Sequence, residues 1–307
     1  MKDTPDHKEP SKALVAVAFA AVYILWGSTY VGIALAIKTI PPFLMAGSRF
    51  FLAGFILYIW CLLTGGKTPD KISFAKSAVA GTLMLYGGTT ALIWGEQYIP
   101  SGLAAVIVAS VPFWFVLLDK RNWKHNFSDK FTILGLLVGF GGIILLFNGK
   151  ASFNLHHKAQ LIAVAVVLIG GFSWAAGSLY SKYSGAEGST IMLASIQMMA
   201  AGLAGIITSC ITGEAFHFVW SNVSMNSIYA ILYLITFGSL IGYIAYIWLL
   251  KVRPPAIVGT YAYVNPVVAM ILGLLLNNEM IGGTQVAALV IILSGVLLVN
   301  LSKYTKA

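Results

Sequence analysis

Two matching stretches that carry proline inside apolar sequence constrain the fold of this chain more than any other feature. Residues 94–112 (WGEQYIPSGLAAVIVASVP) and 248–266 (WLLKVRPPAIVGTYAYVNP) align without a gap at a separation of 154 residues. The coinciding positions include Trp94 with Trp248, Pro100 with Pro254, and Pro112 with Pro266. A proline removes a backbone hydrogen bond and kinks a helix, and paired interruptions of this kind indicate a binding site near the bilayer midplane. The stretches therefore predict two related membrane halves with a site between them.

The composition agrees with a membrane location. The chain has 307 residues, of which 59% are hydrophobic and 9% charged, and its mean hydropathy is +0.86. Soluble domains carry about 25% charged residues, so the expected partner for this much apolar surface is a lipid bilayer. The net charge of +9 does not indicate nucleic acid, because the basic residues are spread over short loops instead of forming one patch.

Ten apolar segments approach or exceed the roughly 20 residues that a helix needs to cross a bilayer. They predict an all-α membrane protein without a soluble domain. The expected helices are 13–36, 43–63, 75–97, 101–118, 131–148, 159–182, 190–212, 226–250, 256–276 and 284–302.

The distribution of lysine and arginine predicts the orientation. If successive loops alternate between the two sides, 15 of the 19 basic residues share the side of the N-terminus. The other side has only Lys38, Lys150 and Lys158, and Arg49 lies inside the membrane. The positive-inside rule therefore places both termini in the cytoplasm. The first apolar run exceeds the core of a signal peptide, so we expect it to remain as the first helix of a multi-pass protein of the cytoplasmic (inner) membrane.

The internal repeat extends through most of the chain. Further matched pairs are Trp26 with Trp174 and Gly54 with Gly202, each 148 residues apart, and Gly142 with Gly295, 153 residues apart. We expect a first repeat at 13–148 and a second at 159–302, with five helices in each. An odd number of helices places the second repeat upside down relative to the first, which is the inverted arrangement of many transporters, built around a central cavity.

Several motifs resemble those of EamA-type permeases of the drug/metabolite transporter superfamily. They are WGSTY at 26–30, RF at 49–50, EQYIPSG at 96–102, VP at 111–112, FGSLIGY at 237–243 and YAYVNP at 261–266, followed by Glu279. The resemblance covers nearly the full chain. It implies two inverted five-helix halves around a cavity and a permease that often exports its substrate. It does not define the substrate, because these permeases carry amino acids, sugars, nucleosides, drugs and other metabolites.

Glu96 and Arg49 are the two ionisable residues in the predicted membrane helices to which we give a possible role in transport. Glu96 ends the third helix, where it could bind a substrate amine, relay a proton or lie in interfacial water. Arg49 lies about 10 Å inside the outer end of the second helix. It could pair with Glu96 or extend toward the lipid headgroups as a structural or coupling residue. The sequence leaves these alternatives open.

Aromatic and polar side chains gather on the helices that carry the matched prolines. Tyr261 and Asn265 are four residues apart and Tyr243 and Tyr246 are three apart, so each pair is expected to share a helix face. For each aromatic ring, helix packing or lipid contact is the alternative. The predicted substrate-binding residues are Trp26, Tyr30, Trp94, Glu96, Pro112, Trp174, Ser178, Tyr243, Tyr246, Tyr261, Asn265 and Pro266.

Common signatures of catalysis are absent from the sequence. The five histidines lie in tails or loops, and no HExxH, GxSxG or Walker-type motif occurs. We therefore predict no catalytic residue, metal site or cofactor. The favoured hypothesis is a secondary transporter for a small organic metabolite or drug, working by alternating access with proton or counter-substrate coupling. A membrane sensor without net transport and an intramembrane enzyme are the alternatives. Gly135 and Gly139 leave monomer and homodimer open.

Overall fold

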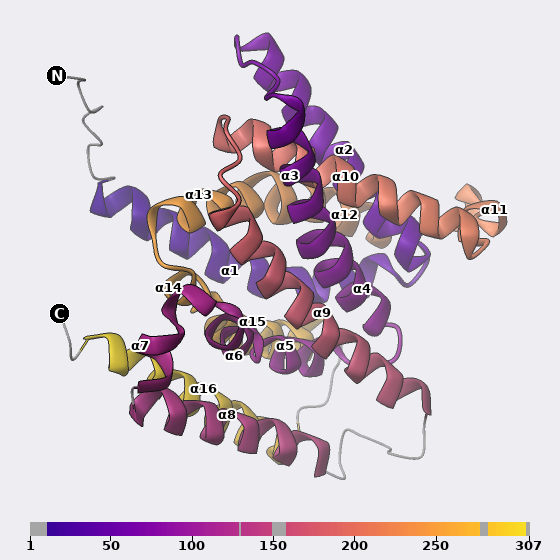
Figure 1. Ribbon diagram of the computed structural model, residues 1–307. Helices are drawn as coiled ribbons and strands as arrows, with labels where there is room; N and C mark the ends of the chain where they lie inside the picture. The colour runs from indigo at the N-terminus through magenta and orange to yellow at the C-terminus, as the bar shows by residue number, and fades with distance from the viewer. Residues whose placement is uncertain (1–10, 129, 149–157, 277–281, 305–307) are drawn as a thin grey trace, which may run out of the picture.

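The computed structural model describes residues 11–128, 130–148, 158–276 and 282–304, and every regular element in these ranges is a helix (Figure 1). In chain order the elements are α1 (Lys12–Ala36), α2 (Pro42–Leu63), α3 (Lys71–Gly81), η1 (Thr82–Thr90), α4 (Ala91–Gly95), α5 (Ser101–Val108), α6 (Val111–Leu118), η2 (Lys120–Asn122), α7 (Trp123–Ser128), α8 (Lys130–Asn148), α9 (Lys158–Tyr183), α10 (Thr190–Ile211), α11 (Glu214–His217), η3 (Trp220–Asn222), α12 (Met225–Tyr233), η4 (Leu234–Tyr243), α13 (Ile244–Val252), α14 (Pro255–Val258), α15 (Tyr261–Leu276) and α16 (Gly283–Tyr304). Glu279 lies outside the described residues.

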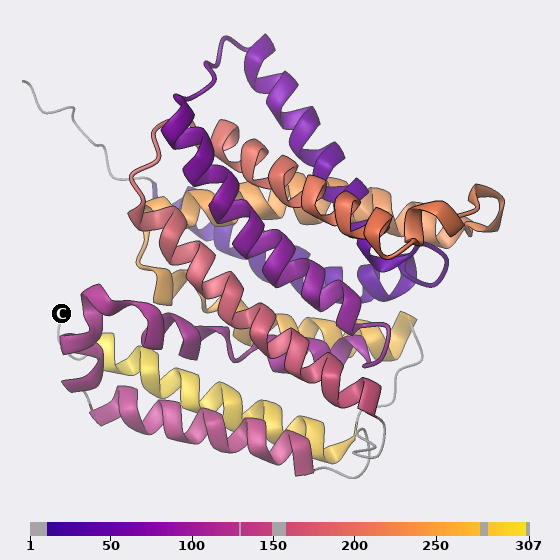
Figure 2. The ribbon, with the colours of Figure 1, turned by 45° about the vertical axis from the view of Figure 1, so that its right-hand side comes forward.

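Six stretches within the described residues are long and apolar enough to cross a membrane. They are Lys12–Ala36, Pro42–Leu63, Ser101–Leu118, Lys158–Tyr183, Thr190–Ile211 and Met225–Val252. Their outer faces carry exposed apolar side chains. Leu63 and Ile211, for example, are each 80% exposed. Such surface suits contact with lipid tails. The start of α1 and the end of α16 lie on the same side of the molecule in both ribbon views (Figures 1 and 2).

Two long helices contain a π-helical middle segment. η1 continues α3 into α4, and η4 continues α12 into α13. A π-helix bonds each N–H to the carbonyl five residues back, which widens the turn and is frequent at functional sites. The Thr90 hydroxyl follows the same spacing and donates to the Leu85 carbonyl at 3.2 Å. Gly88 in η1 and Gly242 in η4 hold the same place in the 154-residue register. The π segments were not predicted from the sequence.

The two proline-bearing helices are interrupted at different places. The first is broken after Val108 and restarts as α6 with Pro112 as its second residue. In the second, α14 ends at Val258 and α15 then runs through Pro266 without a break. The break in the second helix therefore lies four residues earlier than the 154-residue register predicts. Pro112 and Pro266 are both buried in protein.

Glycines allow close contact between α2 and α10, whose glycines Gly54 and Gly202 match at a separation of 148 residues. An added Cβ on Gly54 of α2 would lie 2.7 Å from the Met199 nitrogen of α10, and one on Gly202 of α10 would lie 2.3 Å from the Phe51 nitrogen of α2. Further along, Gly47 faces Gly205. Since the α10 numbers fall as the α2 numbers rise, the two helices run antiparallel.

The last helices of each half pack in the same way. An added Cβ on Gly142 of α8 would meet Ile292 of α16, and one on Gly295 of α16 would meet the backbone of Gly139. Figure 2 shows α8 and α16 side by side along one edge of the molecule. These helices are also antiparallel, because the residue numbers again run in opposite directions.

Candidate functional site

A narrow cavity lies at the centre of the bundle, where α1, α2, η1, α9, η4 and α15 approach one another. Its volume is about 70 Å³, enough for about five water molecules at roughly 10–15 Å³ each on this measure. The polar and aromatic side chains in its wall are Trp26, Thr29, Tyr30, Arg49, Phe50, Thr89, Trp174, Ser239, Tyr243, Tyr261 and Asn265. Aliphatic side chains, together with glycines from η1, α9 and η4, make up the rest of the wall, and the glycines bring helix backbones close to the cavity.

Four aromatic rings meet on one side of this cavity. Trp26 contacts the other three rings. Its ring centroid lies 5.4 Å from that of Trp174, 5.0 Å from that of Tyr246 and 5.1 Å from that of Tyr261. The contacts with Trp174 and Tyr261 are edge to face, which is a favourable geometry for aromatic pairs. The cluster gives the cavity a rigid aromatic wall that can bind the face of an apolar or aromatic solute.

Tyr246 supports this wall from behind and does not line the cavity itself. Its hydroxyl accepts a hydrogen bond from Trp174 Nε1 at 3.0 Å and lies 2.7 Å from Ser178 Oγ. Tyr246 and Ser178 are both fully buried. The two residues therefore hold Trp174 in place, which is a positioning role that differs from the direct contact predicted for them.

Arg49 brings the one fixed charge in the cavity wall, among the residues that the structure describes. It is only 3% exposed. Its Nε donates to Ser239 Oγ at 3.0 Å, and its guanidinium lies 4.9 Å above the Phe50 ring. Nη1 has no hydrogen-bond partner within the described part of the chain. The Glu96 carboxylate acts on Arg49 electrostatically.

Asn265 joins α15 to α1 at the edge of the cavity. With its amide in the orientation that satisfies its neighbours, the nitrogen donates to the Tyr23 and Tyr261 carbonyls at 3.0 Å each. Its side chain also forms a hydrogen bond with Tyr30. Pro266 follows directly and has no N–H group to donate. Asn265 thus fixes Tyr30 and the start of α15 relative to each other.

Two larger cavities are lined by residues that come before and after the central-cavity residues of η1 in the chain. One, of about 310 Å³, includes Lys76, Ser77 and Ala80 of α3 together with Lys182 and Lys251. The central cavity includes Leu85, Gly88, Thr89 and Leu92, and the third cavity, of about 410 Å³, includes Glu96, Gln97, Ile99, Pro100 and Ser101. The lining residues of the three cavities therefore follow one another along residues 76–101.

A hydrogen bond separates the central cavity from the lysine-lined cavity. Tyr243, in the wall of the central cavity, donates to Gln197 Oε1 at 2.7 Å, and Gln197 lines the lysine-lined cavity. Gln197 Nε2 in turn donates to Ser181 Oγ at 3.2 Å. Gln197 was not among the predicted site residues. The signal that could have found it is its position, since it matches Arg49 at the 148-residue separation.

The remaining predicted site residues lie away from the central cavity. Trp94 packs on Tyr98, with ring centroids 5.0 Å apart. Glu96 is 8% exposed and lines the third cavity together with Lys38. Pro112 and Pro266 are buried near the cavity-lining residues Val111 and Asn265 but do not line it.

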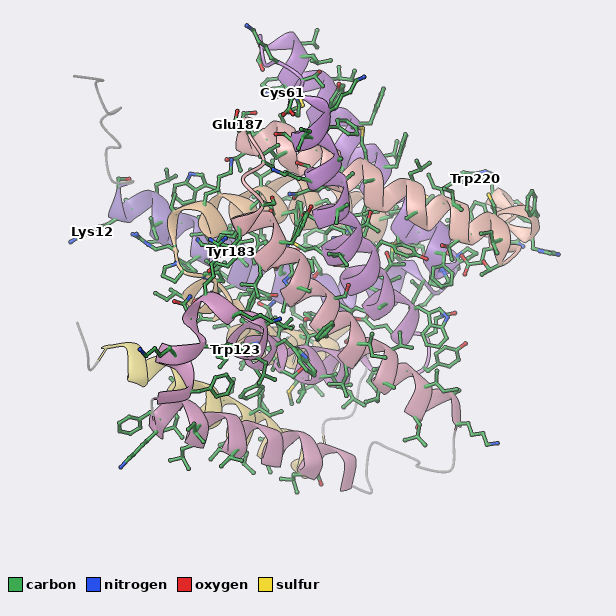
Figure 3. All side chains as sticks on the ribbon, in the orientation of Figure 1. Lys12, Cys61, Trp123, Tyr183, Glu187 and Trp220 are labelled. Carbon is green, nitrogen blue, oxygen red and sulfur yellow. The ribbon has the colours of Figure 1, made fainter. Side chains whose placement is uncertain are left out.

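Exposed tryptophans lie toward opposite ends of the molecule. Trp220 is 79% exposed and Trp123 is 42% exposed. Figure 3 places Trp220 at one end and Lys12, Tyr183 and Trp123 toward the other. Tryptophan at both ends is typical of the two membrane–water interfaces. Over the described residues, no group of three or more His, Cys, Asp or Glu side chains could hold a metal ion.

Comparison with known proteins places these features in a family context. The sequence matches the model of the EamA-like transporter family over residues 13–148 and again over 161–301. The "uncharacterized inner membrane transporter YedA" of Escherichia coli strain K12 is 39% identical, over 94% of this chain and 90% of its own. The "probable amino-acid metabolite efflux pump" of Salmonella typhimurium strain LT2 is 25% identical, over 89% and 90%. A crystal structure 16% identical in sequence has the same fold, with a TM-score of 0.68 over 97% of this chain and 100% of its own.

Proposed function

Because this chain belongs to the EamA-like transporter family, we propose that it is a secondary transporter that carries a small organic metabolite or drug through its central cavity. The observation that carries the proposal is the set of three cavities whose lining residues follow one another from Lys76 to Ser101. An opening between neighbouring cavities would give a solute a path through the protein. The substrate-binding part is the central cavity, with the aromatic cluster around Trp26 as its wall.

Two inverted five-helix repeats, one within 13–148 and one within 159–302, are part of this proposal. Their support is the antiparallel packing of matched helices, α2 against α10 and α8 against α16. Copies related by inversion bring equivalent helices together in opposite directions. A parallel arrangement of the same pairs would have argued against inversion.

The relative size of the cavities supports alternating access. The central cavity is narrow, at about 70 Å³, and the other two are wider, at about 310 and 410 Å³. Rocking of one repeat against the other would widen the centre toward one side at a time. The Tyr243–Gln197 hydrogen bond would have to break when the path opens toward the lysine-lined cavity.

The membrane and the direction of transport are inferred from the relatives and from charge. A relative named as an inner membrane transporter supports the inner membrane, and the basic loops support cytoplasmic termini. A relative named as an efflux pump supports export. A proton or a counter-substrate would supply the energy.

The experiment that tests the proposal has two stages. Purified protein is first screened by thermal shift against amino acids, sugars, nucleosides and cationic drugs, since a ligand of the native state raises the melting temperature. Solutes that bind are then tested for flux in proteoliposomes with and without a pH gradient. Saturable flux supports a transporter. Binding without flux would support a sensor, and a new product would indicate an enzyme.

A further inference from the structure

The buried guanidinium of Arg49 has hydrogen-bonding capacity that the protein leaves unused. Arg49 is 3% exposed, and Nη1 has no partner within the described residues. An arginine does not lose its charge at any ordinary pH, and a buried donor without an acceptor is costly. Intramembrane charges of this kind are commonly functional. Arg49 lines the central cavity, so an anion there that came within hydrogen-bonding distance of the guanidinium would satisfy a donor that is otherwise unpaired.

The surroundings of Arg49 hold its side chain at the cavity wall. Ser239 Oγ accepts from Nε at 3.0 Å, and the Phe50 ring lies 4.9 Å from the guanidinium carbon. Gly238 leaves the necessary space, because a Cβ at that position would lie 2.6 Å from Nη2. The guanidinium is therefore already positioned before a ligand arrives, which lowers the entropic cost of binding.

The rest of the lining indicates what else the ligand carries. Around Arg49 the wall is neutral and mainly apolar, and its aromatic rings are Trp26, Tyr30, Phe50, Trp174, Tyr243 and Tyr261. The other nearby charge, Glu96, lies in the third cavity beside Lys38. One guanidinium can form a bidentate pair with one acid group, and it would leave a second acid group of the same ligand unpaired in an apolar site.

We propose that the central cavity selects small organic acids or zwitterions that have a single acid group and an apolar or aromatic body, and that Arg49 binds the acid group. This inference depends on the proposed function for the location of the substrate site. It goes beyond that function in naming the substrate class.

The test compares acids with the amides that lack the acid group, on the purified full-length protein. The matched pairs are phenylacetate with phenylacetamide and L-phenylalanine with L-phenylalaninamide. Acetate and chloride serve as small anions without an apolar body. Apparent Kd values are taken from the concentration dependence of the melting temperature. The variants are Arg49→Gln and Arg49→Lys, with Arg121→Gln as a matched control in the exposed η2 segment.

We expect each acid to bind at least about tenfold more tightly than its amide, as a charge-assisted hydrogen bond would give. Arg49→Gln should abolish this preference and Arg49→Lys should reduce it, whereas Arg121→Gln should leave it unchanged. Phenylacetate should bind more tightly than acetate or chloride. If Arg49→Gln fails to fold, the binding of each acid and its amide to the wild type, together with the binding of both to Arg49→Lys, still tests the inference.

Several results would overturn the inference. They are equal binding of acids and amides, no binding of either acid, or an acid preference undiminished in the Arg49 variants. If acetate or chloride bound as tightly as phenylacetate, the site would be a general anion site that does not recognise an apolar body. That result would also overturn the inference. Flux of amides or amines independent of Arg49 would refute the acid preference and leave the transporter proposal intact. Acid binding without any flux would support the acid preference and contradict the transporter proposal.

Discussion

Trp26 and Trp174 meet edge to face at the centre of the molecule, with ring centroids 5.4 Å apart and ring planes at 82°. They occupy equivalent positions in the two halves, 148 residues apart. Each packs on a glycine that is also matched: an added Cβ on Gly242 would lie 2.5 Å from Trp26 Nε1, and one on Gly88 would lie 3.1 Å from Trp174. This reciprocal contact is what a two-fold relationship between the halves would produce.

Replacing Gly242 with alanine should displace Trp26 from the aromatic cluster. The new methyl group would lie 2.5 Å from Trp26 Nε1, which donates to the Gly238 carbonyl at 3.0 Å. Overpacking of this kind costs about 1–3 kcal/mol. We expect a lower melting temperature and a loss of solute flux. Gly283→Ala is the control, because open space surrounds that position, and it should be neutral or slightly stabilising. Equal effects of the two substitutions would contradict the tight packing around Trp26.

The contact between α2 and α10 provides a test of the inverted repeat. Gly54→Ala would place a methyl group 2.7 Å from backbone atoms of α10, and Gly202→Ala would place one 2.3 Å from the backbone of α2. Backbone atoms cannot move aside as a side chain can, so each substitution should destabilise the protein by about 1–3 kcal/mol or more. The two losses, measured by unfolding in detergent, should be similar because the sites are equivalent. A large loss at one site and none at the other would argue against equivalence.

The Tyr243–Gln197 hydrogen bond should show energetic coupling in a double-mutant cycle. Tyr243→Phe and Gln197→Leu each remove one partner of the bond, which is 2.7 Å long. Interhelical hydrogen bonds in membrane proteins average about 0.6 kcal/mol, with values up to about 1.7. We expect the coupling free energy of unfolding to fall in this range, since the second mutation has less left to remove. Strictly additive losses would mean that the bond does not contribute.

The stability of the protein should depend on pH through Glu214. This residue of α11 accepts a hydrogen bond from the Leu44 backbone N–H at 3.0 Å and so caps the start of α2. Burial raises the pKa of the Glu214 carboxyl above its ordinary value of 4.5, and the Leu44 and Phe43 N–H groups offset this only in part. Between the ordinary and the raised pKa the folded state binds more protons than the unfolded state. The free energy of unfolding should therefore fall as pH rises through that window.

A comparison of melting temperatures between pH 4 and 7 checks this expectation. Glu214→Gln should remove the part of the pH dependence that comes from this site. Glu187→Gln, a change at an exposed carboxylate in the connection between α9 and α10, should leave the profile unaltered. The same pH profile in the Glu214 variant and the wild type would exclude Glu214 as the source.

Much of the cavity wall could be anticipated from the sequence because helix periodicity and the repeat register fix which residues meet. The shared face of Tyr261 and Asn265 follows from spacing alone. The register matched Trp26 with Trp174 as equivalent positions, but their contact was not predicted from the sequence. Tyr243 lines the cavity as expected. These side chains lie in the wall of the central cavity, and their role in substrate binding stays a prediction.

Other features depend on backbone geometry that residue spacing does not encode. Tyr243 lines the cavity, whereas Tyr246, three residues on, lies behind Trp174, so their shared spacing did not give them the same place at the cavity. The break at Gly259 and Thr260 precedes Pro266, because a proline can be accommodated within a helix when neighbours satisfy the freed carbonyl. Gln197 was missed because its match to Arg49 in the 148-residue register was not taken as a sign of a site.

Solute flux in proteoliposomes with wild-type protein, Tyr261→Ala and Trp220→Ala tests the central claim most directly. Tyr261 lies in the wall of the central cavity, whereas Trp220 is 79% exposed at one end of the molecule. For a solute that raises the melting temperature of the wild type, the account predicts saturable flux, a loss of at least about tenfold in Tyr261→Ala from the lost aromatic contact, and near-normal flux in Trp220→Ala. Undiminished flux in Tyr261→Ala would contradict it, because the solute would then cross by a route outside the central cavity.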